Sequence, residues 1–135
     1  MKTILVVGGA GYIGSHAVKM LLANNYKVVT LDNLSGGYRD SVLGGDFILG
    51  DIADINCLKK LFTDYDFAGV MHFASFIQVG ESVQNPGKYY QNNVAATLNL
   101  LDVMVSHKVK NFIFSSTAAI FGEPQYTPID EQHPK

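Results

Sequence analysis

Cysteine and charge are scarce in this chain of 135 residues, and each scarcity excludes a class of protein. Cys57 is the only cysteine, so no intrachain disulfide can form, which is typical of a reducing compartment such as the cytoplasm. Only 16% of the residues are charged, and a net charge of −2 gives no electrostatic reason to expect nucleic acid or an anionic membrane as a partner. No apolar run approaches the ~20 residues needed to cross a bilayer, and the amino terminus does not resemble a signal peptide. We therefore expect a cytoplasmic protein that binds neither nucleic acid nor membrane.

Apolar residues make up 47% of the sequence, which is enough for a single domain of this length to bury a core. Their spacing alternates between the periods of strands and helices. The pattern predicts strands at 3–7, 27–31, 46–49, 69–73 and 111–115, and helices at 12–24, 54–64 and 86–107. In the last helix, the stripe Val94, Leu98, Leu101 and Val105 is predicted to be buried.

Three of the predicted strands, at 3–7, 69–73 and 111–115, are nearly continuous apolar runs. Strands that helices cover on both faces have this composition. Right-handed crossovers between such strands favour the order 3-2-1-4-5. The sequence therefore predicts an α/β fold of the Rossmann type, with a doubly wound and mostly parallel sheet.

Gly8, Gly11 and Gly14 follow the first predicted strand and open the first predicted helix. Glycines at this spacing allow a tight turn and let the backbone approach a pyrophosphate, to which the helix N-terminus offers N–H groups. Asp32 ends the second strand, where a carboxylate accepts hydrogen bonds from the adenosine ribose and repels a 2′-phosphate. The pattern thus favours NAD over NADP, although Arg39 is close enough in sequence to weaken that preference. The alternative is that the glycines only form a turn and Asp32 only ends a strand.

Six further short strings accompany the glycine motif. They are LDNLS at 31–35, GDI at 50–52, HFA at 72–74, VGESV at 79–83, YYQNNV at 89–94 and FIFSSTA at 112–118. In this combination and order they closely resemble the amino-terminal part of the bacterial UDP-glucose 4-epimerase family, in the extended branch of the short-chain dehydrogenase/reductase superfamily. The resemblance runs from Met1 to about Phe121.

The resemblance implies a set of residues that contact NAD, and no metal. The implied contacts are Tyr12 and Ile13 with the pyrophosphate, Asp32 and Asn33 with the adenosine ribose, Asp51 and Ile52 with the adenine, Phe73, Ala74 and Ser75 in the cleft after the fourth strand, Asn92 with a phosphate or ribose, and Ser115 at the end of the fifth strand. Thr117 falls where the family has a catalytic Ser or Thr, whose hydroxyl binds the 4-oxygen of the sugar. Asn92 could instead be an ordinary surface residue, and Thr117 a strand cap.

The activity implied by the resemblance is the NAD-dependent interconversion of UDP-glucose and UDP-galactose through a 4-keto sugar. The family uses a tyrosine as the base, followed four positions later by a lysine, and none of the seven tyrosines here has a lysine at that position. We therefore expect 1–135 to be an incomplete NAD-binding domain without a nucleotide-sugar domain, inactive alone, from an enzyme that forms homodimers. Ile77 also departs from the family, because many relatives have a lysine there that contacts the cofactor.

Two other functions stay open from the sequence. One is a different extended-branch nucleotide-sugar enzyme, a dehydratase or reductase, although dehydratases carry acidic residues where this chain has Ala118 and Ala119. The other is a non-catalytic NAD-binding module. A sheet that ends at the fifth strand also leaves an edge uncovered, so the chain is expected to self-associate or to be marginally stable.

Overall fold

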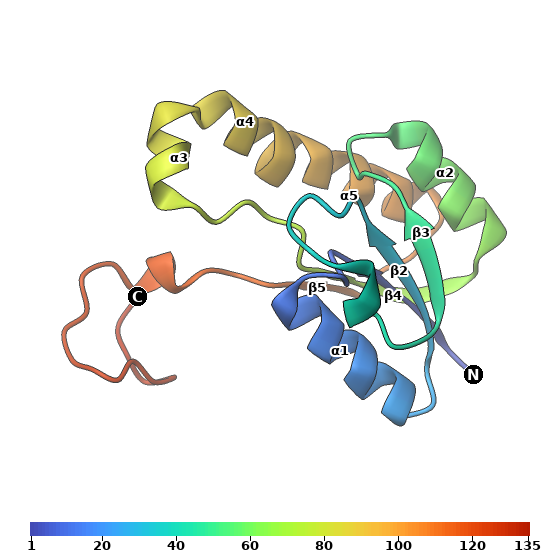
Figure 1. The fold of residues 1–135 in the computed structure, drawn as a ribbon, viewed down its shortest axis with the longest axis horizontal. Helices are drawn as coiled ribbons and strands as arrows, with labels where there is room; N and C mark the ends of the chain where they lie inside the picture. The colour runs from blue at the N-terminus through green and yellow to red at the C-terminus, as the bar shows by residue number, and fades with distance from the viewer.

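The fold is a five-stranded parallel sheet with helices on both faces, as the computed structural model shows for all 135 residues (Figure 1). The strands are β1 (Thr3–Val7), β2 (Lys27–Asp32), β3 (Asp46–Leu49), β4 (Phe67–His72) and β5 (Phe112–Phe114). Their order is β3-β2-β1-β4-β5 and every neighbouring pair is parallel, which confirms the predicted topology. Strand β4 begins two residues earlier than predicted, and β5 is shorter.

Five α-helices connect the strands. They are α1 (Tyr12–Ala23), α2 (Ile55–Asp64), α3 (Val79–Gln84), α4 (Pro86–Tyr90) and α5 (Ala96–Ser106). A π-helical turn, Gln91–Ala95, joins α4 to α5, and short 3-10 turns lie at Arg39–Ser41 and Ala118–Phe121. Helix α3 and the two 3-10 turns are not among the predicted elements. None of the helices combines the length and the apolar character that a bilayer crossing requires.

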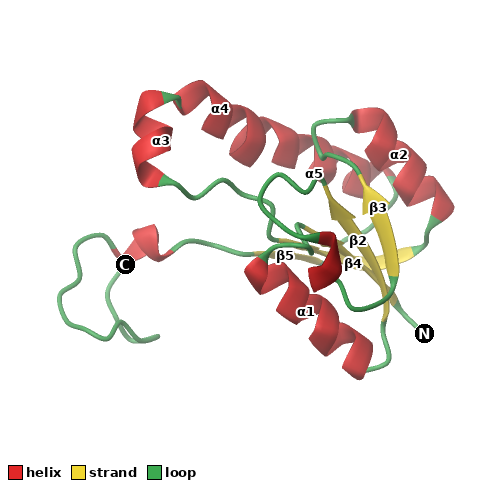
Figure 2. Ribbon diagram, viewed as in Figure 1, coloured by secondary structure: helices red, strands yellow, loops and turns green.

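The core has two layers because alternate residues of each strand face opposite sides of the sheet. Leu5 and Val7 pack towards α2 and α5, against Leu58 and Leu100. The other layer lies under α1, and its buried members are Val6, Ala10, Val18, Val28 and Val42. Figure 2 shows the sheet between these two helical layers, with α1 on one side and α2 and α5 on the other.

The predicted buried stripe of the last helix is wrong except at Leu101, which is half-buried and packs against the core. Val105 is 76% exposed and Leu98 is 55% exposed, whereas the residues that α5 buries are Ala96, Leu100, Val103 and Met104. The helix is apolar on two faces, so its periodicity alone does not select one of them. The π-helical turn before α5 also holds more residues per turn than an α-helix, which changes the phase of the pattern across the junction.

Candidate functional site

The candidate site lies at the edge of the sheet where the parallel strands end. Backbone hydrogen bonds continue the sheet past the strands: the Gly8 N–H donates to the Leu31 oxygen at 2.9 Å, and the Phe73 N–H donates to the Val7 oxygen at 2.8 Å. Ligands of open α/β sheets bind at this carboxyl edge. The predicted residues that follow β1, β2, β3 and β4 are therefore brought to one edge, as expected for a cofactor site.

Residues 8–14, here called the glycine turn, bring backbone segments closer together than side chains would allow. Gly8 has a φ of +78°, and a Cβ there would lie 2.8 Å from the Ala74 nitrogen. At Gly14 a Cβ would lie 2.2 Å from the Gly8 oxygen, so only glycine lets α1 pack this closely on β1. Gly11 precedes α1 and no side chain caps the helix, so its first N–H groups and positive dipole are available to an anion.

Asp32 connects the end of β2 to the glycine turn. One carboxylate oxygen accepts the Ala10 N–H at 2.8 Å, and the other accepts the Leu34 N–H at 2.8 Å. The residue is only 8% exposed, so these two bonds fix its orientation. Each carboxylate oxygen can accept more than one hydrogen bond, which leaves Asp32 able to accept from a ligand hydroxyl.

Arg39 does not face this carboxylate. Its guanidinium carbon lies 4.4 Å from the centroid of the Phe47 ring, and Nη1 donates to the Val42 oxygen at 3.3 Å. A cation–π contact thus holds this cation of the loop after β2 against Phe47 of β3. Held in this way, Arg39 does not weaken the expected preference for NAD over NADP.

A hollow of about 390 Å³ adjoins Asn33 and Asp51. The Asn33 Nδ2 donates to the Asp51 Oδ2 at 2.7 Å, which joins the loops after β2 and β3. The opposite wall comes from α4, the π-helical turn and α5. The lining residues are Asn33, Asp51, Ala53, Phe76, Lys88, Gln91, Asn92, Ala95, Ala96 and Asn99. Polar groups and small side chains at the carboxyl edge suit a flat heterocycle with a hydroxylated sugar.

The segment 73–78, here called the strap, leaves β4 and crosses the same edge. Asn93 holds it like a paired strand, because its Oδ1 accepts the Phe76 N–H at 2.9 Å and its Nδ2 donates to the Phe76 oxygen at 2.9 Å. Asn92 donates to the Ala74 oxygen at 3.3 Å. Both asparagines belong to the π-helical turn, a distortion that occurs frequently at functional sites.

Helix α4 also contacts the strap and is itself bound to α3. Glu81 accepts hydrogen bonds from Lys88 and from the Tyr89 hydroxyl, the latter at 2.8 Å, and these bonds lower the pKa of the Glu81 carboxyl. The Lys88 ammonium also lies 4.7 Å from the centroid of the Phe76 ring. Lys88 of α4 therefore contacts both α3 and the strap.

Thr117 is placed at the carboxyl edge beyond β5, but it does not line the hollow. Its side chain is exposed, and its Oγ1 accepts the Ala119 N–H at 3.1 Å, so it caps the 3-10 turn. That bond leaves the hydroxyl proton available to donate to a substrate oxygen. Ser115 is half-buried, and its N–H donates to the His72 oxygen at 3.0 Å.

Sequence reasoning missed four residues of the site. Gly37 packs on the glycine turn so closely that a Cβ would lie 2.5 Å from the Ala10 carbonyl atoms. Asn93 fastens the strap, Thr97 bonds to the Asn93 oxygen at 3.1 Å, and Asn99 reaches the Ile52 oxygen at 3.5 Å. Two of these positions had a signal in the sequence: the adjacent glycines 36 and 37 indicate a turn, and Asn93 lies in the string YYQNNV, although neither signal predicts the contact.

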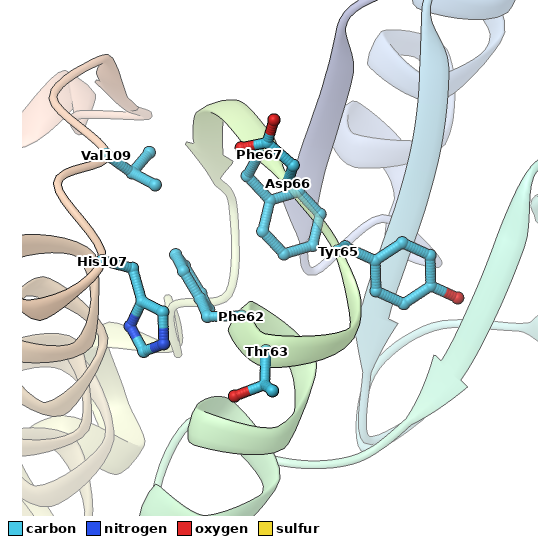
Figure 3. Close-up of a pocket in the computed structure, with 7 residues that line it drawn as sticks. All are labelled: Phe62, Thr63, Tyr65, Asp66, Phe67, His107 and Val109. Atoms are coloured by element: carbon cyan, nitrogen blue, oxygen red, sulfur yellow. The ribbon is translucent and has the colours of Figure 1, made fainter.

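A second hollow, of about 230 Å³, lies at the opposite edge of the sheet (Figure 3). It is lined by Phe62, Thr63, Tyr65, Asp66, Phe67, His107 and Val109. Its rings mostly pack on one another, with centroids 5.0 Å apart for Phe62 and Phe67 and 5.6 Å apart for Phe62 and His107. This hollow sits where β4 and β5 begin, so it takes no part in the candidate site.

Comparisons with known proteins agree with this geometry. Residues 4–135 match the NAD dependent epimerase/dehydratase family. The chain is 49% identical to the UDP-glucose 4-epimerase of Halalkalibacterium halodurans, over 97% of this chain and 39% of that protein. It superposes on UDP-glucose 4-epimerase from Brucella ovis in complex with NAD with a TM-score of 0.89 and 46% identity, over 97% of this chain and 40% of that one. For the UDP-glucose 4-epimerase from Bifidobacterium longum in complex with NAD+ and UDP, the TM-score is 0.88 and the identity is 38%, over 98% of this chain and 42% of that one.

Proposed function

The chain belongs to the NAD dependent epimerase/dehydratase family, and from that premise we propose that it is the NAD-binding part of a UDP-glucose 4-epimerase. Such an enzyme interconverts UDP-glucose and UDP-galactose through a 4-keto sugar. The chain spans about two fifths of the length of the relatives it matches, so the activity of the whole protein is part of the proposal.

The observation that carries the proposal is the Asp32 carboxylate, fixed by the Ala10 N–H at 2.8 Å beside the glycine turn. The turn keeps its close backbone contacts because Gly8 and Gly14 lack side chains, and the uncapped start of α1 offers N–H groups to a pyrophosphate. The residues present therefore fit NAD, which when bound supplies a reversible hydride acceptor.

The proposed roles of the remaining residues follow from their places at the carboxyl edge. Backbone N–H groups of Tyr12 and Ile13 bind the pyrophosphate; Asp32 and Asn33 hold the adenosine ribose; Asp51 and Ile52 flank the adenine; Phe73, Ala74 and Ser75 of the strap, Asn92 and Ser115 line the cleft. Thr117 donates its free hydroxyl proton to the 4-oxygen of the sugar. NAD is preferred over NADP because Asp32 repels a 2′-phosphate and Arg39 is held by Phe47.

Epimerisation is favoured over dehydration by the sequence after Thr117. Elimination of water requires an acid and a base on the sugar, and Ala118 and Ala119 offer neither. The chain also contains no tyrosine followed four positions later by a lysine. We therefore expect these 135 residues to bind NAD without converting UDP-galactose by themselves.

The proposal extends to the setting of the enzyme. A single cysteine fits a cytoplasmic location, and a UDP-sugar substrate fits the UDP named with the Bifidobacterium longum relative. The exposed apolar face formed by Val94 of the π-helical turn and by Leu98 and Val105 of α5 fits a homodimer or a contact with another part of the enzyme.

The direct test is calorimetric titration of the protein with NAD and, separately, with NADP. We expect saturable binding of NAD, accompanied by a rise in melting temperature, and at least tenfold weaker binding of NADP, because ligands that bind only the folded state stabilise it. Failure to bind either dinucleotide would contradict the proposal.

A further inference from the structure

His72 is a buried polar residue that the proposed function leaves without a role. It ends β4, directly before the strap, and is only 1% exposed. The centroids of the Phe112 and Phe114 rings lie 6.2 and 5.5 Å from that of its imidazole. Its single side-chain partner is Thr97 of α5, whose Oγ1 lies 3.2 Å from Nε2. A histidine in these surroundings needs a reason, because apolar side chains would pack there at lower cost.

One assignment of the protons satisfies both contacts of the Thr97 hydroxyl. The Thr97 hydroxyl has one proton, and it donates this proton to the Asn93 carbonyl oxygen at 3.1 Å. Oγ1 then accepts from His72 in the tautomer that carries the imidazole proton on Nε2. Nδ1 remains a buried acceptor without a partner, which is less costly than an orphaned N–H donor. His72 is therefore a neutral donor to Thr97.

The hydrogen bonds continue from Thr97 to the strap. Asn93, whose backbone oxygen accepts from Thr97, uses its side chain to bind both the N–H and the oxygen of Phe76 at 2.9 Å. The Asn93 Oδ1 also accepts from the Nδ2 of Asn92 at 2.8 Å. The strap begins at the residue after His72, so it is attached to His72 twice, through the peptide chain and through this relay.

We propose that His72 is a positioning residue for the dinucleotide, acting through Thr97 and Asn93 to hold the strap and Asn92 in the arrangement that binds it. The inference rests on the proposed function, because the strap and Asn92 are assigned there to the NAD cleft. Fixing these groups before the ligand arrives reduces the entropy that binding must otherwise overcome.

The surroundings of His72 favour its neutral form; an imidazolium keeps the Nε2 donor, but its buried charge would draw the ring out of its place beside Thr97. Burial lowers the pKa of His72, and no charged side chain of β1, α5 or β5 contributes to the shift. Protonation would place an uncompensated charge between Phe112 and Phe114 and a second donor in a site with one acceptor. Because the folded-state pKa is below the unfolded value, the unfolded state binds more protons, so stability falls as the pH drops below about 6.5.

The test compares Thr97→Val, which removes the hydroxyl, with Thr97→Ser, which keeps it. We expect Thr97→Val to weaken NAD binding about tenfold, the size of one lost buried hydrogen bond, and Thr97→Ser to stay near wild type. Hydrogen exchange at the Phe76 amide should accelerate in Thr97→Val alone, since that amide donates to Asn93. Equal behaviour of the two variants in both measurements would overturn the proposal.

A second comparison separates positioning from general packing. As the pH is lowered from about 7.5 to below about 6.5, NAD binding should weaken and the protection factor of the Phe76 amide, which corrects for the slower intrinsic exchange in acid, should fall in the wild type. Both should change less in His72→Gln, which keeps a donor but does not titrate. If Thr97→Val does not fold, His72→Phe, which has no donor, is compared with His72→Gln, which has one, and equal Phe76 protection factors in these two variants overturn the relay. If the wild type binds no NAD at any pH, the proposed function fails, while Phe76 exchange still decides whether His72 holds the strap.

Discussion

At the scale of single residues, the Asp32 carboxylate has two roles at the candidate site. Asp32 accepts the Ala10 N–H and so holds the glycine turn, and its charge faces the place proposed for the adenosine ribose. Asp32→Asn keeps the size and one acceptor oxygen but removes the charge. We expect NAD affinity to fall by roughly tenfold to a hundredfold, the range for hydrogen bonds to a charged group, and the preference over NADP to narrow.

Arg39→Gln is the matched control for this substitution, measured by the same titrations with both dinucleotides. Because the guanidinium sits over Phe47, its removal should leave the ratio of NAD to NADP affinity unchanged. If the affinity ratio changes in Arg39→Gln and not in Asp32→Asn, then Arg39 discriminates between the two dinucleotides and the role given to Asp32 is wrong.

The residues that could be predicted from the sequence are those whose chemistry is local. Gly8, Gly14 and Asp32 stand at fixed positions relative to a strand and a helix, and both elements can be recognised from spacing. Asn93 and Thr97 act across the fold, on a strap and on a histidine that are distant along the chain. Nothing in the sequence distinguishes Asn93 from its neighbour Asn92, because their tasks depend on the direction of each side chain in the π-helical turn.

At the scale of elements, the loop between β2 and β3 is more ordered than its composition suggests. The Tyr38 N–H donates to the Ala10 oxygen at 3.1 Å, and Arg39–Ser41 forms a 3-10 turn. The loop therefore rests on the glycine turn and supports it from outside. The sequence indicated only a region rich in Gly, Ser and Asn, because such contacts arise from the fold and leave no periodicity.

Two adjacent glycines of this loop provide a matched test. A Cβ on Gly37 would lie 2.5 Å from the carbonyl atoms of Ala10 and 2.9 Å from the Gly11 nitrogen, whereas one on Gly36 would meet nothing within 4 Å. Gly37→Ala should therefore destabilise the protein by about 1–3 kcal/mol, the usual cost of overpacking, and should weaken NAD binding. Gly36→Ala should change neither. Denaturant titration and calorimetry check both effects, and equal losses in the two variants would show that the loop does not support the turn.

At the scale of the whole molecule, the strand order could be predicted because it depends on general rules of handedness and burial. Which surface of α5 faces the core could not, since the helix is apolar on both sides and the choice depends on its partners. Apolar side chains consequently remain on the surface, at Leu98 and Val105 of α5 and along β5 at the edge of the sheet.

The edge strand leads to a prediction about association. Ile113 is 58% exposed and Phe114 is 49% exposed, and β5 pairs only with β4, so its outer backbone groups and apolar side chains both face outward. Edges of this kind pair with other chains unless a charge blocks them. We expect sedimentation velocity to show self-association that increases with concentration, and Ile113→Lys to reduce it. Leu43→Lys makes the same change at a residue that is 69% exposed in a loop, and should leave association intact. A wild-type chain that stays monomeric at high concentration would contradict the prediction, and equal effects of the two lysines would attribute association to charge rather than to the edge.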